Sequence, residues 1–464
     1  MTTASAPPGP VGTQSPGATQ SGRRVLTASL IGTTIEWYDF YLYAQAAALV
    51  FSATFFPEST PAIALISAFA TYGVGFAARP LGGIIAGHLG DRIGRKQLLV
   101  ASLVLMGVST FLIGLLPGYA TIGIWSVIGL VVLRLLQGIS SGAEWGGSAL
   151  LSVEHAPAGR RGFWGSFTQA GSAGGMLLAT GAVWGTQGLV GVEAFADWAW
   201  RVPFLASAVL VVIGLIIRLG VEEAPEFRQL RDAGAVRRLP VLEVLKRHPR
   251  GLLVTVGLRL VQPAWFSIIT VYSLSYLQSH RDDSTSGVQA LLIVSAFSLV
   301  STPLWGWLSD RIGRRRIAIA AALGIGVAVW PFFAFLDHGP LALLWLVFFV
   351  GTNVLHDAIY GPQAAWFAEQ FPTDLRYSGV SLGYQVGSIF SAGLTPLLAV
   401  VMVEAGGGSP WILCVFIGVY AVLTSVAAFF AKDGVRDDVE LAASDDLELE
   451  LDALVDGEQV AARP

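Results

Sequence analysis

The sequence has little charge and almost no cysteine, and each shortage excludes a class of protein. Only 13% of its 464 residues are charged, which is about half the share found in an ordinary soluble protein. The single cysteine, Cys414, excludes a disulfide, a Cys₄ zinc site and a thiol pair within one chain. The sequence also lacks a Walker loop, a dinucleotide-binding glycine pattern after a strand, a metal-ligand cluster and a nucleophile elbow. We therefore expect no enzyme, no cofactor and no metal site, and no loop has room for an ATP-binding domain.

Long apolar runs dominate what is present. Hydrophobic residues make up 54% of the chain, and each apolar run can cross a bilayer core, which needs about 20 helical residues. The twelve runs are 25–55, 62–89, 97–116, 121–152, 163–186, 201–219, 251–277, 287–308, 317–336, 341–367, 377–403 and 410–431. Lipid cannot satisfy a free sheet edge, and the alternating ten-residue strands of a barrel are absent. The sequence predicts an all-α integral membrane protein with twelve transmembrane helices.

The distribution of positive charge predicts the orientation of these helices. Most of the 28 Lys and Arg residues lie in loops on one side of the predicted bundle, and that side should be cytoplasmic. Both termini should lie there, in a protein of the inner (plasma) membrane. We expect a disordered tail at 1–22, a six-helix half at 23–219, a basic cytosolic linker at 220–250, a second half at 251–431 and an acidic cytosolic tail at 432–464. The first tail does not have the pattern of a signal peptide.

One loop motif occurs twice and predicts a duplicated architecture. Residues Gly87–Lys96 read GHLGDRIGRK, and residues Gly306–Arg315, 219 positions later, read GWLSDRIGRR. A second pair, the motif that begins at Glu154 and the one that begins at Glu369, repeats at an offset of 215. Two anchors in the same order at nearly the same offset indicate two parallel halves of six spans.

The charged residues of this loop predict a gate on the cytosolic side. We expect its aspartates to cap or pair with neighbouring helix ends and its arginines to contact carboxylates and helix carbonyls, so that the loop latches one conformation. The alternative is that the positive charge serves only to fix topology. The candidate gate residues are Gly87, Asp91, Arg92, Gly94, Arg95, Gly306, Asp310, Arg311, Gly313 and Arg314.

These loops and several other motifs resemble a known transporter superfamily. The loops resemble the signature of the major facilitator superfamily, and Arg134-Leu-Leu-Gln137-Gly138 resembles its R-x-x-Q-G motif. Further stretches, within a resemblance that covers about residues 24–431, are similar to the metabolite:proton symporter family. They are Glu36-Trp-Tyr-Asp39-Phe-Tyr, Arg79-Pro-Leu-Gly, Gly142-Ala-Glu144-Trp145-Gly-Gly, Trp200-Arg-Val-Pro-Phe, Glu222-Glu-Ala-Pro-Glu226-Phe and Tyr377-Ser-Gly-Val-Ser-Leu-Gly-Tyr384-Gln385.

The resemblance implies the major facilitator fold and proton-coupled uptake of a small polar metabolite. In that family the substrate is commonly an organic acid such as shikimate, α-ketoglutarate or citrate, with proline and betaine in one branch. Two departures stand out. Gly171-Ser-Ala-Gly174-Gly175 lacks the proline of an antiporter-type motif, and the long coiled-coil tail of the osmolyte-sensing branch has no counterpart, which counts against betaine.

Two carboxylates in the first apolar run are candidate proton carriers. Glu36 and Asp39 lie at positions i and i+3 and share a helix face. Two carboxylates about 5–6 Å apart in a low dielectric cannot both carry charge cheaply, which suits a group that takes up a proton. The alternative is a structural ion pair with Arg79 or Arg134.

The run 121–152 carries a polar stripe that should face a watery cavity. Arg134, Gln137, Ser141, Glu144 and Ser148 all project from one side of a helix. The Arg134 guanidinium stays protonated and its fork suits a substrate carboxylate, with Gln137 beside it. Glu144 could receive a proton or hold Arg134. The alternative for Arg134 is a fixed salt bridge.

The second half offers a matching set of polar groups. Arg259 and Gln262 are candidate substrate ligands, and Asp357 is the main candidate for a proton or ion-pair site. His356 lies beside the face of Asp357 and is either a proton-transfer group or, more commonly for a lone histidine, a hydrogen-bonding one. Gln385 is a further substrate candidate, and Trp145 and Tyr384 either stack on a substrate ring or pack.

The sequence therefore predicts a monomeric secondary transporter of the rocker-switch type. Its partners would be protons, a small polar substrate and the lipid bilayer, and not a nucleic acid. An organic acid is the favoured substrate, and a proline/betaine symporter is the runner-up. Two rival classes are a drug or product exporter of the same fold and a membrane sensor that binds a ligand without transporting it.

Overall fold

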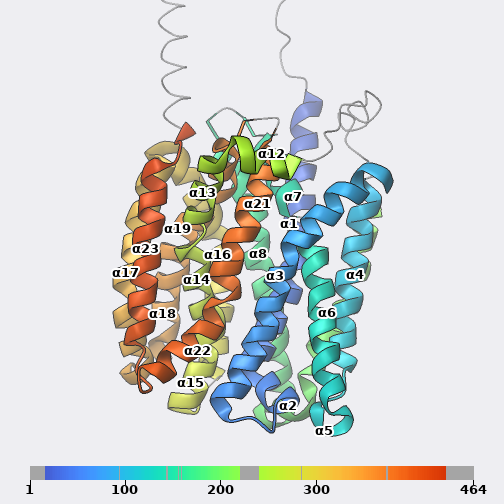
Figure 1. The fold of residues 1–464 in the computed structure, drawn as a ribbon, viewed down its shortest axis with the longest axis vertical. Coiled ribbons are helices and arrows are strands. Elements are labelled where there is room, and N and C mark those ends of the chain that lie inside the picture. The colour runs from blue at the N-terminus through green and yellow to red at the C-terminus, as the bar shows by residue number, and fades with distance from the viewer. Residues whose placement is uncertain are drawn as a thin grey trace, which may run out of the picture.

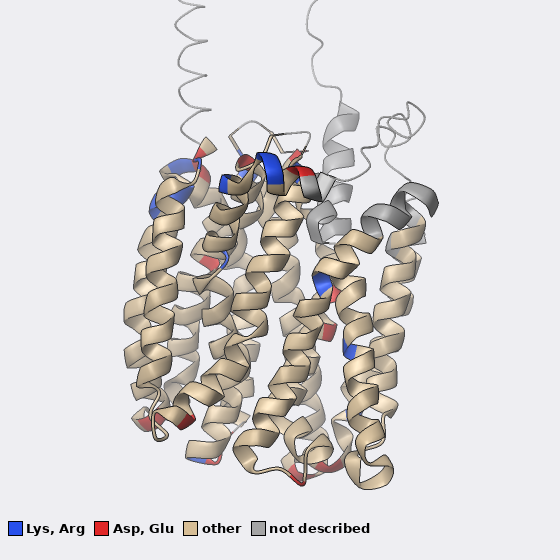
Figure 2. Cartoon of the chain, in the orientation of Figure 1, with Lys and Arg blue, Asp and Glu red and all other residues tan. Residues whose placement is uncertain are grey.

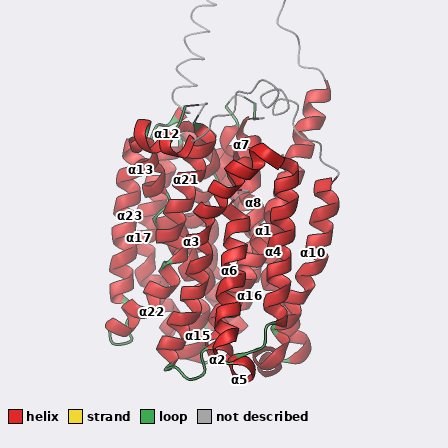
Figure 3. Ribbon diagram, turned by 45° about the vertical axis from the view of Figure 1, so that its right-hand side comes forward, coloured by secondary structure: helices red, strands yellow, loops and turns green. Residues whose placement is uncertain are grey.

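The computed structural model describes most of the chain between Pro16 and Gly434. The described residues are 16–93, 95–142, 145–154, 156–157, 159–219, 240–283, 285–372 and 375–434, without the side chains of 16–29, 86–93, 95–96, 99, 145–148, 151, 217–219 and 240–242. Within these ranges the chain folds into helices joined by short turns, and no strand is drawn (Figure 3). The described helices run roughly parallel to the long axis of the molecule (Figure 1).

Twelve helical spans account for this architecture in the described part of the chain. Nine are long helices: α1 (Pro16–Ala46), α3 (Pro61–Ile93), α4 (Arg95–Leu115), α6 (Ile124–Gly142), α8 (Arg161–Val190), α10 (Arg201–Leu219), α16 (Thr285–Ile312), α17 (Arg314–His338) and α23 (Trp411–Phe430). Three are broken into shorter helices: α13 (Pro249–Leu258), α14 (Val261–Ser267) and α15 (Ser273–Arg281); α18 (Leu344–Phe349), α19 (Asp357–Tyr360) and α20 (Gln363–Glu369); and α21 (Arg376–Ser388) with α22 (Thr395–Ala405). The twelve-span prediction is confirmed.

Hydropathy supports the membrane assignment for these spans. Eight described spans are long and apolar enough to cross a bilayer by length and composition, and α8 is a ninth if the 120° bend that follows it is counted within one span. Two shorter apolar helices, Val100–Leu115 and Arg201–Ile216, lie within α4 and α10. The remaining span, α1, holds Glu36 and Asp39. Small helices connect the spans: α2 (Ser52–Phe55), α5 (Tyr119–Ile122), α7 (Trp145–Glu154), α9 (Val192–Ala194) and α12 (Pro240–Arg247).

Several spans contain a π-helical turn, in which one extra residue widens the helix. Such turns are frequent at functional sites. In the described spans they lie after α1 and α14, between α18 and α19, and after α21. Their bounds are Ala47–Phe51, Ile268–Tyr272, Val350–His356 and Ile389–Gly393. The helix that carries Arg134, α6, has no such turn.

The surface of the bundle is apolar where lipid would meet it. Val209, Val300, Val327 and Phe429 each expose more than half of their surface, whereas the polar stripe residues Arg134 and Gln137 are fully buried. This arrangement, with apolar residues outside and charges inside, is the reverse of a soluble protein.

The two six-helix halves lie side by side, with α3, α4 and α6 on one side of Figure 1 and α17, α18 and α23 on the other. They meet mainly along α8 with α16 and along α3 with α22. Lys and Arg gather at one end of the bundle, where α12 lies and where α16 is followed by α17 (Figure 2). We call it the basic end. The prediction that this end is cytoplasmic remains a prediction.

The predicted domain boundaries differ slightly from the helix ends. α1 begins at Pro16, inside the stretch 1–22 that we expected to be a tail, and α12 occupies part of the predicted linker 220–250. Residues 1–15, 220–239 and 435–464 lie outside the described residues, so the predictions made for them stay predictions.

Candidate functional site

The interior of the bundle holds a small set of buried charges. Few charged residues interrupt the tan helices away from their ends (Figure 2). The first half contributes Arg79, Arg134, Glu36 and Asp39, and the second contributes Arg259 and Asp357; each exposes 3% of its surface or less. Charges at this depth are costly to bury and mark functional sites in membrane proteins.

Two arginines of the first half lie inside an aromatic cage. The Cζ of Arg79 is 4.0 Å from the centre of the Phe40 ring, and the Cζ of Arg134 is 4.3 Å from the same ring centre. The other cage rings lie within 5.2 Å of one or the other guanidinium; they are Trp37, Phe76, Tyr43 and Tyr72. Ring faces attract cations. The cage therefore compensates part of the cost of burying two positive charges.

The caged guanidiniums keep unused donors. The Nε and Nη2 atoms of both Arg79 and Arg134 are buried without a hydrogen-bond partner among the described residues. The space for Arg134 depends on Gly75 of α3, because a Cβ there would lie 2.4 Å from Arg134 Nε. Buried donors without acceptors are expensive. This arrangement suits a site that receives its acceptors from a bound anion.

The two helix-1 carboxylates, Glu36 and Asp39, lie beside this cage. Ser141 of α6 donates a hydrogen bond to Glu36 Oε1, and Asp39 faces the Thr110 hydroxyl and the charge of Arg134. Neither Arg79 nor Arg134 forms an ion pair with a carboxylate of the described chain. Three ring faces surround Arg79, and the structural ion pair proposed for it stays a prediction.

The polar stripe of α6 is present as expected over its described length. Arg134 Nη1 donates to Gln137 Oε1 at 3.0 Å, and Gln137 Nε2 donates to Thr110 Oγ1 at 2.7 Å. The stripe faces α1, because Tyr43 lies over Arg134 and Ser141 reaches Glu36. The side chains of Glu144, Trp145 and Ser148, which continue the predicted stripe, lie outside the described residues.

The second half holds its arginine by hydrogen bonds. Arg259 Nη1 donates to Gln262 Oε1 at 2.7 Å and also to Gln363 Oε1, and Arg259 Nε donates to Ser388 Oγ at 3.2 Å. The Tyr384 ring lies under the guanidinium, 3.8 Å from Cζ. The predicted substrate ligands Arg259, Gln262 and Tyr384 thus form one cluster. Gln385 is adjacent in sequence and leaves a buried Oε1 without a partner.

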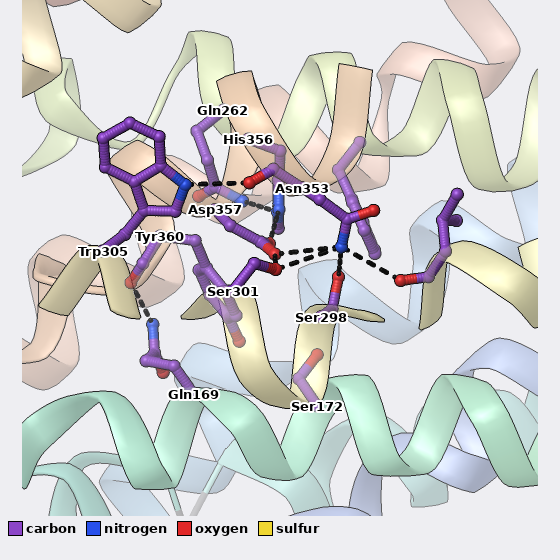
Figure 4. Close-up of polar contacts among 12 residues, drawn as sticks. Gln169, Ser172, Gln262, Ser298, Ser301, Trp305, Asn353, His356, Asp357 and Tyr360 are labelled. Atoms are coloured by element: carbon purple, nitrogen blue, oxygen red, sulfur yellow. Dashed lines mark hydrogen bonds and ion pairs between the residues drawn. The ribbon is translucent and has the colours of Figure 1, made fainter. Parts of the chain in front are cut away.

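A histidine continues this cluster to the buried carboxylate Asp357. The Gln262 amide nitrogen lies 2.5 Å from His356 Nε2, and His356 Nδ1 lies 2.8 Å from Asp357 Oδ1. The other Asp357 oxygen accepts from Ser301 at 2.5 Å (Figure 4). We call Arg259, Gln262, His356 and Asp357 the relay. Sequence reasoning left His356 beside the polar face and did not count it among the site residues.

The π-helical turn Val350–His356 explains why the sequence underrated His356. A wheel of 3.6 residues per turn places Asn353 and Asp357 together and His356 aside. The wider turn changes that register. In the structure, both Asn353 and His356 consequently belong to the hydrogen-bond network of Asp357. Asn353 Nδ2 also donates to Ser298 Oγ at 2.8 Å (Figure 4). The recognisable signal is a histidine directly before a buried aspartate.

A column of rings connects the cage with the relay. Trp37 of the cage stacks on Tyr41 at 5.2 Å, Tyr41 meets Phe266 of the other half at 5.8 Å, and Phe266 stacks on His356 at 4.2 Å. Tyr41 also shares a 2.5 Å hydrogen bond with Ser172 of α8. The two groups of buried charge therefore belong to one continuous interior between the halves.

The second copy of the repeated loop ties the two halves together at the basic end. Asp310 of α16 accepts hydrogen bonds from the backbone N–H groups of Gly162 (2.8 Å) and Phe163 (2.9 Å), at the start of α8 in the other half. Arg314 donates to Asp310 at 3.0 Å and also binds Glu369. Gly313, which ends α16, has φ +97°, a conformation that favours glycine.

Only some of the other predicted gate residues lie among the residues whose side chains the structure describes. Arg311 lies over the Trp307 ring, with its Cζ 4.0 Å from the ring centre. Gly306 packs so closely on α8 that an added Cβ would lie 2.7 Å from Gly162 O. The first copy, with Gly87, Asp91, Arg92, Gly94 and Arg95, lies outside the residues whose side chains are described.

Comparisons with known proteins agree with this architecture. A family model described as Major Facilitator Superfamily matches residues 29–376 and 260–455. The shikimate transporter of Escherichia coli K12 is 41% identical over 419 residues, covering 89% of this chain and 95% of that protein. The proline/betaine transporter of Salmonella typhimurium LT2 is 35% identical over 396 residues, covering 82% of this chain and 78% of that protein. These relatives are transporters and not enzymes.

A solved structure shows the same fold at lower sequence similarity. The xylose transporter XylE from E. coli, in a partially occluded inward open conformation, matches with a TM-score of 0.70. The match covers 89% of this chain and 98% of that one at 19% sequence identity. At that identity the likeness concerns the fold alone.

Proposed function

Because the chain belongs to the major facilitator superfamily of membrane transporters, we propose that it imports a small organic anion together with a proton. The observation that carries this proposal is the pair of caged guanidiniums, Arg79 and Arg134, whose buried Nε and Nη2 groups lack acceptors among the described residues. A carboxylate matches the planar fork of an arginine, because its two oxygens can accept from two N–H groups at once. We infer that these two residues, with Arg259 across the interface, hold the substrate.

The balance of buried charge supports proton coupling. Two cations, Arg79 and Arg134, lie near two carboxylates, Glu36 and Asp39, so the cage is neutral when both carboxylates are ionised. Protonation of one carboxylate leaves a net positive charge that attracts an anion. Asp39 lies in the field of Arg134 and is our main candidate for this proton. Glu144 remains a further candidate.

The cage disfavours a cationic or zwitterionic substrate. Betaine-like ammonium groups bind to free aromatic faces, but here the guanidiniums of Arg79 and Arg134 already lie over the rings of Phe40 and Tyr43. A quaternary ammonium would find these ring faces already occupied by guanidiniums. An organic acid such as shikimate, the substrate named for a relative that is 41% identical, fits this environment better than betaine, named for one that is 35% identical.

The gate and the membrane context complete the proposal. Asp310 would release the start of α8 when the basic end opens, and the corresponding residue of the first loop, Asp91, would act in the same way. The site lies between the halves, as alternating access requires. We propose that the protein works as a monomer in the bacterial inner membrane, with the basic end in the cytoplasm.

Uptake into proteoliposomes tests this function. A panel of radiolabelled shikimate, a dicarboxylate, proline and betaine is offered under an imposed pH gradient and, separately, an imposed membrane potential. A monoanion that moves with one proton is electroneutral, so accumulation should follow the pH gradient alone. A zwitterion with a proton would also respond to voltage, at about 2.3 kcal/mol per 100 mV. Uptake indifferent to both gradients would refute symport, and preferential uptake of betaine would refute the anion site.

A further inference from the structure

The relay in the second half forms a directional chain of hydrogen bonds. Arg259 can only donate, and an ionised Asp357 can only accept. Between them, the Gln262 amide oxygen faces Arg259 at 2.7 Å, and its amide nitrogen faces His356 Nε2 at 2.5 Å. His356 Nδ1 then faces Asp357 at 2.8 Å. Every contact pairs one donor with one acceptor only if the His356 ring is neutral and carries its hydrogen on Nδ1.

Protonation of His356 breaks this pairing at one place. A second proton on Nε2 makes that nitrogen a donor, and it then faces the amide nitrogen of Gln262, which is also a donor. The conflict disappears if the Gln262 amide turns by 180° and presents its oxygen to His356. The amide nitrogen then faces Arg259 Nη1, so that Arg259 loses one of its two acceptors there and keeps only Gln363.

We propose that Gln262 is a two-position amide switch that reports protonation of His356 to Arg259 and so opens Arg259 to the substrate carboxylate. This inference rests on the proposed function, in which Arg259 helps to hold an organic anion. It assigns to Gln262 and His356 a role in coupling that differs from direct substrate contact. It also orders the events: proton uptake at His356 precedes engagement of the anion by Arg259.

The surroundings of His356 leave few other charges to compete. Asp357 and Arg259 are the charged groups whose fields reach the ring, and Tyr360 is the titratable neighbour on the same helix, at 5.0 Å between rings. The packed face of α16 contributes the neutral side chains of Ser298, Ser301 and Trp305 (Figure 4).

Among the residues that the structure describes, the other elements near His356 add no further charge. α14 adds Phe266, stacked on the imidazole, and α17, which also packs on this turn, carries its charged residues only at its two ends. From α1 and α21, Tyr41 and Tyr384 face Tyr360.

The helical segment that carries His356 and Asp357 also contacts the first half of the protein, as an element that couples the two halves must. Gln169 of α8 donates to the Tyr360 backbone oxygen at 3.2 Å, one turn after His356. Figure 4 shows Gln169 and Ser172 of α8 beside Tyr360. A change of hydrogen bonding in the relay is thus within one turn of the interface that alternating access rearranges.

The pH dependence of binding tests the switch. Purified full-length protein is titrated with radiolabelled shikimate by equilibrium dialysis between about pH 5.5 and 8.5, a range centred near the ordinary titration of histidine. A proton taken up at His356 on binding adds about one to the slope of log Kd against pH over part of this range, in addition to any contribution from Asp39. Leucine at position 262 has no amide, so it cannot pass the protonation state of His356 on to Arg259. In Gln262→Leu shikimate should therefore still bind, and the slope of log Kd against pH should fall by about one.

A second variant keeps the test decisive. In Gln262→Glu a carboxylate can accept from Arg259 and from protonated His356 at once, so Arg259 stays occupied at every pH. We expect binding at least tenfold weaker at low pH, with a reduced slope. The matched control is Gln137→Leu, since Gln137 accepts from Arg134 in the same i, i+3 geometry but donates to Thr110 and no histidine. The affinity of Gln137→Leu for shikimate can change, but the slope of log Kd against pH should equal that of the wild type.

Three results would overturn the switch: an unchanged slope in Gln262→Leu, wild-type affinity in Gln262→Glu, or an equal loss of slope in Gln137→Leu. Each leaves the proposed function intact if the wild type binds shikimate. A wild type that binds no member of the anion panel at any pH would instead refute the proposed function, and the switch with it.

Discussion

Replacing Arg134 by lysine tests the fork of the caged guanidinium while keeping its charge. In the structure this side chain uses Nη1 for Gln137 at 3.0 Å and leaves Nε and Nη2 buried without partners among the described residues. Its flat face meets Phe40 and Tyr43 with Cζ at 4.3 and 4.1 Å from the ring centres. A lysine ammonium is a compact point charge that cannot stack in this way or present two parallel donors to a carboxylate.

The expected loss of binding free energy in Arg134→Lys can be estimated from the hydrogen bonds that the substitution removes. If the substrate carboxylate takes both unused donors, Arg134→Lys removes at least one charge-assisted hydrogen bond, worth about 1.5–3 kcal/mol. This corresponds to about 10- to 150-fold weaker binding. Counterflow in proteoliposomes, in which unlabelled substrate inside drives entry of labelled substrate, measures the apparent affinity without a proton gradient.

A matched control separates the fork from a general effect of the substitution. Arg201 stacks on Trp200, with Cζ 4.4 Å from the ring centre, and donates to the Leu116 backbone oxygen outside the site. Arg201→Lys should leave the apparent affinity unchanged. If Arg134→Lys also leaves it unchanged, the caged guanidinium does not bind the substrate and the reasoning from its unused donors is wrong.

Four further substitutions give independent expectations. Asp39→Asn should abolish accumulation in a pH gradient but retain counterflow, and concentrative uptake by this variant would exclude Asp39 as the proton site. Gly75→Ala places a Cβ 2.4 Å from Arg134 Nε, so we expect at least tenfold weaker substrate binding, checked by equilibrium dialysis. Phe40→Leu removes a ring shared by two buried cations, each contact worth about 1–2 kcal/mol, and should lower the unfolding temperature; an unchanged temperature would contradict the cage. Asp310→Ala removes the cap on the start of α8, worth about 1–2 kcal/mol, and should raise the labelling rate of a cysteine introduced behind the gate, whereas an unchanged rate would show that this contact does not hold the basic end closed.

The fold was predictable because its strongest signal, long apolar runs, depends only on composition and length. The predicted run 163–186 corresponds to α8 (Arg161–Val190), and 410–431 corresponds to α23 (Trp411–Phe430). The ends of the spans were predicted less accurately. The run 121–152 spans both α6 and α7, and α1 begins well before residue 25, because hydropathy does not mark where a helix continues beyond the apolar region.

The site was predictable where the helices are regular. Arg134, Gln137 and Ser141 lie on one face of α6 by simple periodicity, and in the structure Arg134 and Ser141 contact residues of α1. It could not be predicted where contact depends on the packing of distant helices. The ring that both guanidiniums contact, Phe40, is one of 25 phenylalanines in the chain, and no local pattern identifies it.

His356 shows a second limit of periodicity. Its place in the relay depends on a π-helical turn, which shifts the register of the residues that follow. It also depends on Gln262, which is 94 positions away in sequence. In a sequence, a lone histidine within a membrane span more often indicates a structural hydrogen bond than a functional group. Only the three-dimensional chain of donors and acceptors distinguishes it.

The π-helical turns give the two halves of the site different mechanical properties. Arg134 lies on α6, whose backbone ladder is regular from Ile124 to Gly142, so its position should vary little between states of the carrier. The relay lies on two spans that each contain a π turn, at Ile268–Tyr272 and at Val350–His356. Such a turn has an irregular hydrogen-bond ladder and acts as a joint. The anion would therefore be received by a rigid support in one half, while the backbone of the other half bends around it.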